Sequence, residues 1–420
     1  MKRTVRQRRT KAKDLHQPQA AEAPLEPIDP RVALVQALIP VVLDRVAELL
    51  KEDVIAAAGA RYARGDHAPT RVRWGQQSGS IYLADQKVPI AVPRVRDRAT
   101  NTEVPLPAYQ ALQTPRALDR ALLQTILGGL STHEYGRCVQ LVPQAFGLSA
   151  STTSRRFRRA SRRALVALQE RRLGGEPIVA LLLDGKTFAD DTMVVAVGVL
   201  ATGEKRILGL VQTATENRPV CAAFLRRLLD RGLRIEDGVL VVVDGSKGLA
   251  AAVHEVFGIH GVLQRCQWHK RENVVRYLPK AHHAGMRAKL QRAYEQPTYE
   301  RAKKALAQVR RELTVLNTSA AASLDEGLEE TLTLHRLGCF RAVGLSLKTT
   351  NVLESIHARV ASRTDKVDVW KNSDQKHRWL ATALLDLEPR LHRIKGFAAL
   401  PQLQQALLRH VRRGAEREAA

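Results

Sequence analysis

Three carboxylates occur in contexts that suit metal-assisted chemistry. Asp184 follows an apolar run at 181–183, Asp244 follows another at 241–243, and Glu354 lies much later, in a segment that favours a helix. Carboxylate oxygens are the ligands that Mg²⁺ and Mn²⁺ prefer in proteins. If the three side chains converge, they can hold two such ions, which together activate water or a 3′-hydroxyl for attack on a phosphodiester.

Each carboxylate also has a purely structural explanation. Asp-Gly after a strand is a common turn signal, so either aspartate alone would more often belong to a turn than to a catalytic site. Asn351 and Glu354 have the spacing of a capping box, in which the glutamate accepts a hydrogen bond from a backbone N–H at the helix start. Spacing also leaves open three alternative ligands, Asp190, Asp191 and Glu216. Two strand-end aspartates in one strongly basic chain favour the catalytic hypothesis.

A sheet edge is needed to bring the two aspartates together. A strand that is apolar throughout is buried on both faces, so its end is where side chains first reach the open edge of the sheet. Strands are predicted at 178–184, 192–200, 205–213, 239–244 and 261–265, with helices at 220–229 and 247–257. This order predicts a mixed α/β sheet with both aspartates at strand ends. The glycine after each aspartate is expected to let the backbone turn there.

The segments after the sheet are predicted to be helical. Residues 272–340 are charged and show no strand pattern, a helix carrying Glu354 follows, and the tail from Trp379 to Arg413 is helical again. We therefore expect a helical insertion to interrupt the α/β core. The first part of the core, the insertion, and the second part of the core with the C-terminal helices are predicted at 176–271, 272–345 and 346–420.

The N-terminal segments follow different patterns. A basic tip and a Pro/Ala/Glu stretch predict a disordered tail over residues 1–30. Residues 31–110 are predicted to hold one or two amphipathic helices with a break at Pro40, followed by a small β hairpin within 71–107. The hairpin is interpreted as a structural element and not as a site.

Residues 111–175 have the pattern of a DNA-binding module. Three helical stretches are predicted: Gly128 and Gly129 end the first, a capping box at Ser131 opens the second, and Ser149 caps the third. Arginines are predicted on the outward positions of the third helix, and the candidate DNA contacts are Arg155, Arg156, Arg159, Arg162 and Arg163. This order is typical of a helix-turn-helix whose last helix docks in the major groove. An ordinary bundle with a solvated basic face is the alternative, but so many like charges on one helix favour DNA.

The overall composition indicates a polyanionic partner. The 420 residues include 67 Lys and Arg against 42 Asp and Glu, a formal net charge of +25 at pH 7. Nucleic acid is favoured over a membrane, because the apolar stretch at 32–50 is interrupted by charged residues and by Pro40. Four scattered cysteines argue against a disulfide framework, and no signal-peptide pattern follows the basic start. We therefore expect a soluble, cytoplasmic protein of a reducing compartment.

Several segments resemble, in order, the signature motifs of the Mutator-type transposases of bacterial insertion sequences. They lie at 183–185, 231–233, 243–249, 264–273 and 349–355, with 130–135 and 147–151 upstream. The resemblance implies an RNase H-like catalytic fold with an Asp-Asp-Glu triad on Asp184, Asp244 and Glu354. It also implies a helical insertion before the glutamate, with which the spacings of 60 residues between the aspartates and 110 residues from Asp244 to Glu354 agree.

The resemblance further implies a function. A protein of this kind binds the terminal inverted repeats of its element and catalyses metal-dependent DNA cleavage and strand transfer. The expected cofactor is a pair of Mg²⁺ or Mn²⁺ ions. Its partners would be the element ends, the target DNA and a second copy of the chain, since two ends need at least two active sites. The alternatives are a stand-alone nuclease of the same fold and a DNA-binding regulator derived from a transposase that has lost catalysis.

Cys266 and His269 match the Cys-x-x-His motif of the same family, just after a predicted strand. A zinc site would need two more ligands, and no second Cys-x-x-Cys or His-x-x-His pair exists in the sequence. We expect a structural role that supports the active-site edge, with contact to DNA as the alternative.

Overall fold

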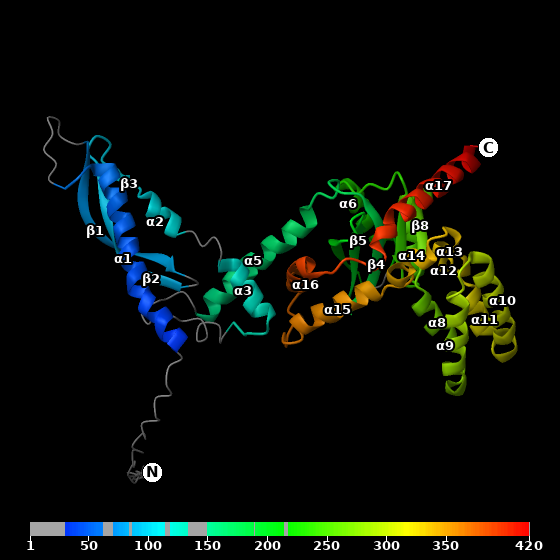
Figure 1. Cartoon of the computed structure of the whole chain (residues 1–420). Helices are drawn as coiled ribbons and strands as arrows, with labels where there is room; N and C mark the ends of the chain where they lie inside the picture. The colour runs from blue at the N-terminus through cyan, green and yellow to red at the C-terminus, as the bar shows by residue number, and fades with distance from the viewer. Residues whose placement is uncertain are drawn as a thin grey trace, which may run out of the picture. The chain divides into compact units, whose positions relative to one another are not determined.

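The computed structural model describes residues 30–61, 70–83, 86–113, 118–132, 149–188, 190–213 and 217–419, without the side chains of 30–39, 118–121 and 418–419. These residues belong to two compact units. The first unit contains the described residues up to 113, and the second contains those from 118 onward. Figure 1 shows the two units, each of which is described by itself below.

The first unit is a three-stranded antiparallel sheet with a long helix packed on it. Its elements are α1 Pro30–Ala58, β1 Arg71–Leu83, β2 Gln86–Asp97, β3 Glu103–Val104 and α2 Pro107–Leu112. The predicted hairpin is confirmed. The predicted break at Pro40 is wrong, because α1 continues through it. The backbone hydrogen bond that proline cannot donate is offset by packing further along, where Val46, Leu50 and Val54 join the core of this unit.

The second unit contains a five-stranded sheet in the order β6-β5-β4-β7-β8. The strands are β4 Ile178–Phe188, β5 Asp191–Leu200, β6 Lys205–Thr213, β7 Val239–Val243 and β8 Gly261–Arg265. β4, β5 and β6 are antiparallel to one another, whereas β7 is parallel to β4 and β8 is parallel to β7. The predicted mixed α/β sheet is thus confirmed.

The predicted end of the first strand at Asp184 is wrong. β4 continues to Phe188, because its second half pairs with β5 as one arm of a long hairpin, as far as Phe188 opposite Asp191. Gly185 therefore lies within the strand, opposite Val194, and does not form a turn. What ends at Asp184 is the pairing of β4 with β7, which is the shorter strand.

Helices cover both faces of the sheet. Leu181 and Leu183 point into a core formed with α6 Arg218–Asp230 and α7 Lys247–Phe257. Leu182 points into the opposite core, which is formed with α14 to α17 and the end of α5. The bounds of these helices are α5 Ala150–Glu170, α14 Phe340–Leu347, α15 Asn351–Thr364, α16 Ser373–Leu387 and α17 Leu400–Ala419. Because side chains alternate along a strand, Asp184 lies on the same face as Leu182, the face that α15 covers.

The stretch between β8 and α15 is entirely described, and it contains helices and no strand, as predicted. Its helices are α8 Gln267–Val275, α9 Lys280–Tyr294, α10 Tyr299–Leu316, α11 Thr318–Asp325, α12 Leu328–Thr331, α13 Thr333–Arg336 and α14. Most of them share a core of their own, in which Leu290, Leu306 and Leu313 are fully buried. The insertion is therefore a small helical subdomain attached to the sheet through β8.

The predicted arginine-rich helix is α5. Ser149 caps its start by accepting a hydrogen bond from the Thr152 N–H (3.3 Å), and α3 Leu118–Leu127 ends at Gly129, whose φ of 101° only glycine adopts easily. The helix predicted between α3 and α5 falls mostly on residues 133–148, outside the described residues. α5 packs on α16, where the rings of Phe157 and Trp379 lie 4.7 Å apart.

The outward orientation predicted for Arg156 is wrong. Its side chain is only 6% exposed, because it lies three residues after Thr153 and four before Ala160 on the stripe that faces the core. The other candidate arginines of α5, namely Arg155, Arg159, Arg162 and Arg163, are exposed.

Candidate active site

The strand register places the two aspartates side by side. β4 and β7 are neighbouring parallel strands in which Leu183 pairs with Val243, so the next residue of each strand is an aspartate at the same edge. Asp184 is 7% exposed and the Asp244 side chain is half-buried. Local patterns predicted both strands, and the register brings their carboxylates together.

Glu354 reaches this edge from a helix. It lies in the first turn of α15, whose buried residues pack across β4. The helix begins at Asn351, its N-cap is Thr350, and no side chain makes a capping hydrogen bond there. The capping-box alternative, which requires Asn351 before the helix, is therefore not the observed arrangement, and the carboxylate is not engaged in capping.

Two buried polar atoms near the aspartates lack hydrogen-bond partners. They are Oε1 of Glu354 and Nε2 of His357. Oε1 of Glu354 lies 3.8 Å from Nε2 of His269, and Nε2 of His357 lies 3.7 Å from Oδ2 of Asp184. A buried polar atom without a partner costs about 1–3 kcal/mol, so such atoms are expected where a ligand will bind.

The donor set at this edge fits a hard divalent cation. Three carboxylates can supply oxygen ligands to Mg²⁺ or Mn²⁺, and the Oε1 atom of Glu354 is buried without a hydrogen-bond partner. Within the described ranges, no three acidic, histidine or cysteine side chains are close enough to form a metal site as they stand. The residues that would share a metal are thus neighbours rather than a preformed cage.

The end of α15 that carries Glu354 is held by the Cys-x-x-His motif. Cys266 follows β8, is completely buried, and accepts hydrogen bonds from the backbone N–H of Thr350 (3.4 Å) and from its hydroxyl (3.7 Å). Nδ1 of His269 lies 3.3 Å from the same hydroxyl. Both motif residues therefore contact Thr350, which directly precedes the helix of Glu354.

His269 is electrostatically linked to the carboxylates. Burial alone would lower its pKa, but the interaction with Cys266 and the negative charges of Asp184 and Asp244 outweigh burial and raise the pKa to about 9. The imidazole therefore carries a positive charge at pH 7. A cation here reduces the mutual repulsion of the carboxylates.

Asp244 is held by its own turn and by a buried arginine. Its Oδ1 accepts a hydrogen bond from the Ser246 N–H (2.9 Å), and Ser246 caps α7. Arg265, the last residue of β8, is 4% exposed and donates to the carbonyl of Gly245 (2.9 Å). Gly245 has no positive φ, so the turn depends on these bonds rather than on glycine conformation.

His357 and Arg265 were not predicted as site residues from the sequence. His357 lies one helical turn after Glu354, and a Glu-x-x-His spacing, which places both side chains on one face of a helix, is the signal that could have identified it. Burial and the Lys186 ammonium lower the pKa of His357 to about 4, so the ring is neutral at pH 7 and its approach to Asp184 is not an ion pair. Arg265 gave no separate signal, because it ends a short strand beside a second polar residue, Gln264.

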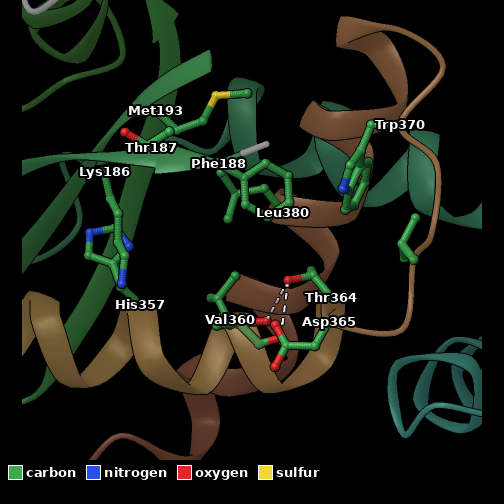
Figure 2. Close-up of a pocket in the computed structure, with 12 residues that line it drawn as sticks. Lys186, Thr187, Phe188, Met193, His357, Val360, Thr364, Asp365, Trp370 and Leu380 are labelled. Atoms are coloured by element: carbon green, nitrogen blue, oxygen red, sulfur yellow. Dashed lines mark hydrogen bonds between the residues drawn. The ribbon is translucent and has the colours of Figure 1, made fainter. Parts of the chain in front are cut away.

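A cavity of about 340 Å³ extends from His357 along α15. His357 and Lys186 lie at one end of it and Trp370 lies at the other, with Phe188 and Leu380 between them (Figure 2). The rings of Phe188 and Trp370 touch edge to face at 4.9 Å. The carboxylate edge thus adjoins an aromatic-lined space on the α15 face of the sheet.

The alternative carboxylates are engaged elsewhere or outside the described chain. Asp191 lies at the far end of the β4–β5 hairpin and forms an ion pair with Lys376 (2.5 Å), whose hydrogen bond lowers the pKa of Asp191. Asp190 is exposed at the hairpin tip. Glu216 lies outside the described residues. The structure therefore gives no support to these three as ligands.

Comparisons with known proteins identify the same family as the sequence motifs, the Mutator-type transposases. The profile described as "Transposase, Mutator family" matches residues 11–392. A transposase for insertion sequence element ISRM5 of Rhizobium meliloti is 31% identical over 78% of this chain and 81% of its own length. A transposase for IS406 of Burkholderia multivorans is 26% identical over 82% of this chain and 88% of its own length. A transposase for IS256 of Staphylococcus aureus is 24% identical over 71% of this chain and 76% of its own length.

A mixed α/β sheet with carboxylates at one edge, in a strongly basic chain, defines an enzyme that processes nucleic acid. The chain belongs to the Mutator family of transposases. Transposases act on DNA, which agrees with the expected polyanionic partner. No helix of the described part is both long and apolar enough to cross a membrane.

Proposed function

We propose that this transposase binds the terminal inverted repeats of its insertion sequence and catalyses metal-dependent DNA cleavage and strand transfer at Asp184, Asp244 and Glu354. The observation that carries the proposal is the pairing of Leu183 with Val243, which places the two aspartates at one sheet edge, beneath the helix that bears Glu354. Two parallel strands added to a three-stranded antiparallel sheet, in the order found here, support an RNase H-like fold.

The chain's own residues would organise the reaction as follows. The three carboxylates would hold one or two Mg²⁺ or Mn²⁺ ions, which supply Lewis acidity toward a scissile phosphate and activate water or a 3′-hydroxyl. Asp244 is oriented by Ser246, and Glu354 is oriented through Thr350 by Cys266 and His269. We infer that the motif positions Glu354 rather than binding zinc. The neutral His357 beside Asp184 offers a ring nitrogen that can take part in a hydrogen bond at this edge.

DNA would be presented to this edge by α5. Its exposed arginines Arg155, Arg159, Arg162 and Arg163 form a basic face, and we propose that α3 and α5 belong to a helix-turn-helix that reads the element ends. The buried Arg156 is not part of this proposal. Because two ends must be processed together, we propose a dimer as the working form.

The test uses the full-length protein and duplexes that carry the terminal inverted repeats flanking its gene. With Mg²⁺ or Mn²⁺, the protein is expected to cut the ends and join the exposed 3′-hydroxyls to a second duplex. Asp244→Asn should reduce both steps by about 10³-fold or more while end binding remains within about twofold. An Asp244→Asn protein that still joins ends would refute the assigned site.

The same assay separates the rival functions. A stand-alone nuclease would cut without joining, and a regulator without catalysis would bind the ends and do neither. The presence of all three carboxylates at one edge weighs against the regulator. The helical insertion and the basic α5 weigh against the simple nuclease, which needs neither of them.

A further inference from the structure

A second cavity of the sheet-containing unit, here called the arginine cavity, is lined mainly by cationic side chains. It measures about 440 Å³ and lies between α13 and α17. Its charged or titratable lining residues are Arg336, Arg409, His410, Arg413 and Arg417, and no carboxylate lines it. Nothing in the proposed catalytic mechanism uses this cavity.

The arginine cavity lies at the end of the parallel strands opposite to the aspartates. α17 is anchored by Leu407 and Val411, which approach Gly238 just before β7 begins. One turn further along α17, Gly414 packs near the side chain of Ile259, which lies just before β8, so that a Cβ at position 414 would be 3.8 Å from it. The arginines of α17 are thus beside the amino ends of these strands, whereas Asp244 follows the carboxyl end of β7. α17 is the red helix in Figure 1.

The charges of the arginine cavity are close to one another and lack acidic partners. Arg409, Arg413 and Arg417 recur every four residues on one face of α17, an arrangement in which like charges repel. Neither they nor Arg336 form an ion pair with any acidic residue of the described chain.

The pKa values of two neighbouring groups, Glu329 and His410, are lowered in part by the positive charge of the cavity. Hydrogen bonds from Lys303 (2.7 Å) and the Tyr299 hydroxyl (2.6 Å) lower the pKa of Glu329, and the charge of Arg336 adds to this effect. Because Glu329 is engaged by Lys303 and Tyr299, it does not neutralise the cavity. Burial lowers the pKa of His410, and the charges of Arg336 and Arg417 lower it further. Concentrated positive charge of this kind favours an anionic ligand.

The geometry of the cavity suits a row of phosphates. The three arginines of α17 span about 12 Å at the rise of an α-helix. Phosphates of one DNA strand recur about every 3.4 Å of the duplex axis, so a row of this length can contact several of them. Arginine is also suited to phosphate, because its planar guanidinium can bind two phosphate oxygens at once.

The arginine cavity and α5 lie toward opposite edges of the sheet. α5 and α16 contact the edge strand β6, whereas α13 contacts the other edge strand, β8. We propose that the arginine cavity binds the phosphate backbone of a DNA duplex separate from the one held by α5. The inference rests on the proposed function in naming DNA as the polyanion and in assigning the first duplex to α5.

The first experiment counts duplexes bound to the full-length protein. Sedimentation with a short fluorescent duplex of random sequence should show two duplexes per chain for the wild type. The variant R409A/R413A/R417A should bind one. The control R412A changes an exposed arginine of the same helix that does not line the cavity, and it should still bind two. One duplex per chain in the wild type would overturn the proposal.

The second experiment measures the charge contribution of a single arginine. In the background R155A/R159A, which weakens the α5 site, affinity for the same duplex is measured over a range of KCl concentrations. Adding Arg413→Ala should lower the slope of log affinity against log salt by about 0.9, whereas Arg413→Lys and Arg412→Ala should preserve it. Equal slopes for Arg413→Ala and Arg412→Ala would contradict the proposal.

A parallel arm distinguishes DNA from smaller phosphates. Calorimetric titration with inorganic phosphate is run on the wild type, R413A and R412A. A phosphate-binding heat that only R413A loses, together with unchanged duplex binding in R413A, would assign the cavity to a free phosphate compound and overturn the DNA assignment. These binding measurements require no cleavage, so a negative result would leave the catalytic proposal intact. Conversely, an Asp244→Asn protein that still joined ends would refute the catalytic proposal without affecting the interpretation of the binding measurements.

Discussion

The two ends of the parallel strands β7 and β8 carry opposite charges: carboxylates gather at the carboxyl ends and arginines at the amino ends. The two clusters are assembled in different ways. At the carboxyl ends, Asp184, Asp244 and Glu354 come from three elements that are far apart in the sequence. At the amino ends, three of the four arginines of the arginine cavity come from one helix at a regular spacing. A local repeat is sufficient to build the arginine array, whereas the carboxylate site depends on strand register and helix packing.

Burial differs in the same way. Asp184 is 7% exposed and one Glu354 oxygen is buried in a side chain that is 42% exposed, whereas the arginines of the arginine cavity are exposed. A site that performs chemistry needs fixed positions and little water, while a backbone-binding surface needs charge at roughly the right spacing. We therefore expect substitutions at the carboxylate end to change rates and those at the cationic end to change binding.

The largest expected effect separates the two ends directly. Glu354→Gln should lower strand cleavage by about 10³-fold or more, because the amide cannot replace an anionic metal ligand, and should leave the number of bound duplexes unchanged. R409A/R413A/R417A should do the reverse, losing one duplex while cleaving a saturating end substrate at a rate within about threefold of the wild type. If both variants lost both properties, the two ends would not be functionally distinct.

The next effect tests how the carboxylate end is supported. Cys266→Ala removes the sulfur that accepts hydrogen bonds from Thr350 and should reduce cleavage by about 10–100-fold, the usual effect of losing a group that orients a metal ligand. Cys221→Ala is the matched control, because Cys221 is also a fully buried cysteine but lies in α6. Equal losses of activity in the two variants would show that Cys266 contributes only packing.

A smaller effect is expected at α5. R155A/R159A should weaken binding to element-end DNA and lower the salt slope by about 2, since each arginine is predicted to contact one phosphate. R155K/R159K preserves the charge and should retain most of the slope. Affinity that is the same for both variants at every salt concentration would remove the recognition-helix hypothesis.

The smallest effect concerns the pH dependence of stability at the carboxylate end. Burial and the repulsion of Arg265 lower the pKa of Lys270 from 10.5 to about 8. Between these pH values the unfolded chain binds more protons than the folded chain, so stability gains from this lysine as pH rises from about 8 to about 10.5. The gain should be absent in Lys270→Met, as measured by urea unfolding of both proteins at several pH values. A constant difference in the free energy of unfolding between the two proteins would contradict it.

Local patterns predicted much of the fold. The strand and helix bounds in the second unit agree with the sequence analysis within a few residues, because apolar periodicity reflects burial on one or two faces. The errors have tertiary causes. β4 continues beyond Asp184 because β5 pairs with it past the end of β7. α1 continues through Pro40 because its later turns pack on a sheet. Arg156 is buried because α5 packs on α16.

The candidate site was predictable only in its residue types. Asp184 and Asp244 were identified by the apolar runs before them, and Glu354 depended mainly on resemblance to the transposase family. The placement of Arg265 could not be predicted, since it belongs to no local pattern with one structural meaning, whereas the Glu-x-x-His spacing was an available signal for His357. The arginine cavity was also missed: the repeat of Arg409, Arg413 and Arg417 is visible in the sequence, but Arg336 joins it only through the tertiary structure, since α13 and α17 are separated by more than sixty residues.

The sequence by itself determined the positive charge, the alternation of strands and helices, and the presence of the three carboxylates, since these properties depend on composition and on the neighbours of each residue. Only the tertiary structure decided that Leu183 pairs with Val243, that α15 crosses the sheet beside Asp184, and that Thr350 meets Cys266 and His269. Convergence of these groups depends on contacts between segments up to 170 residues apart along the chain, and no local preference specifies such contacts.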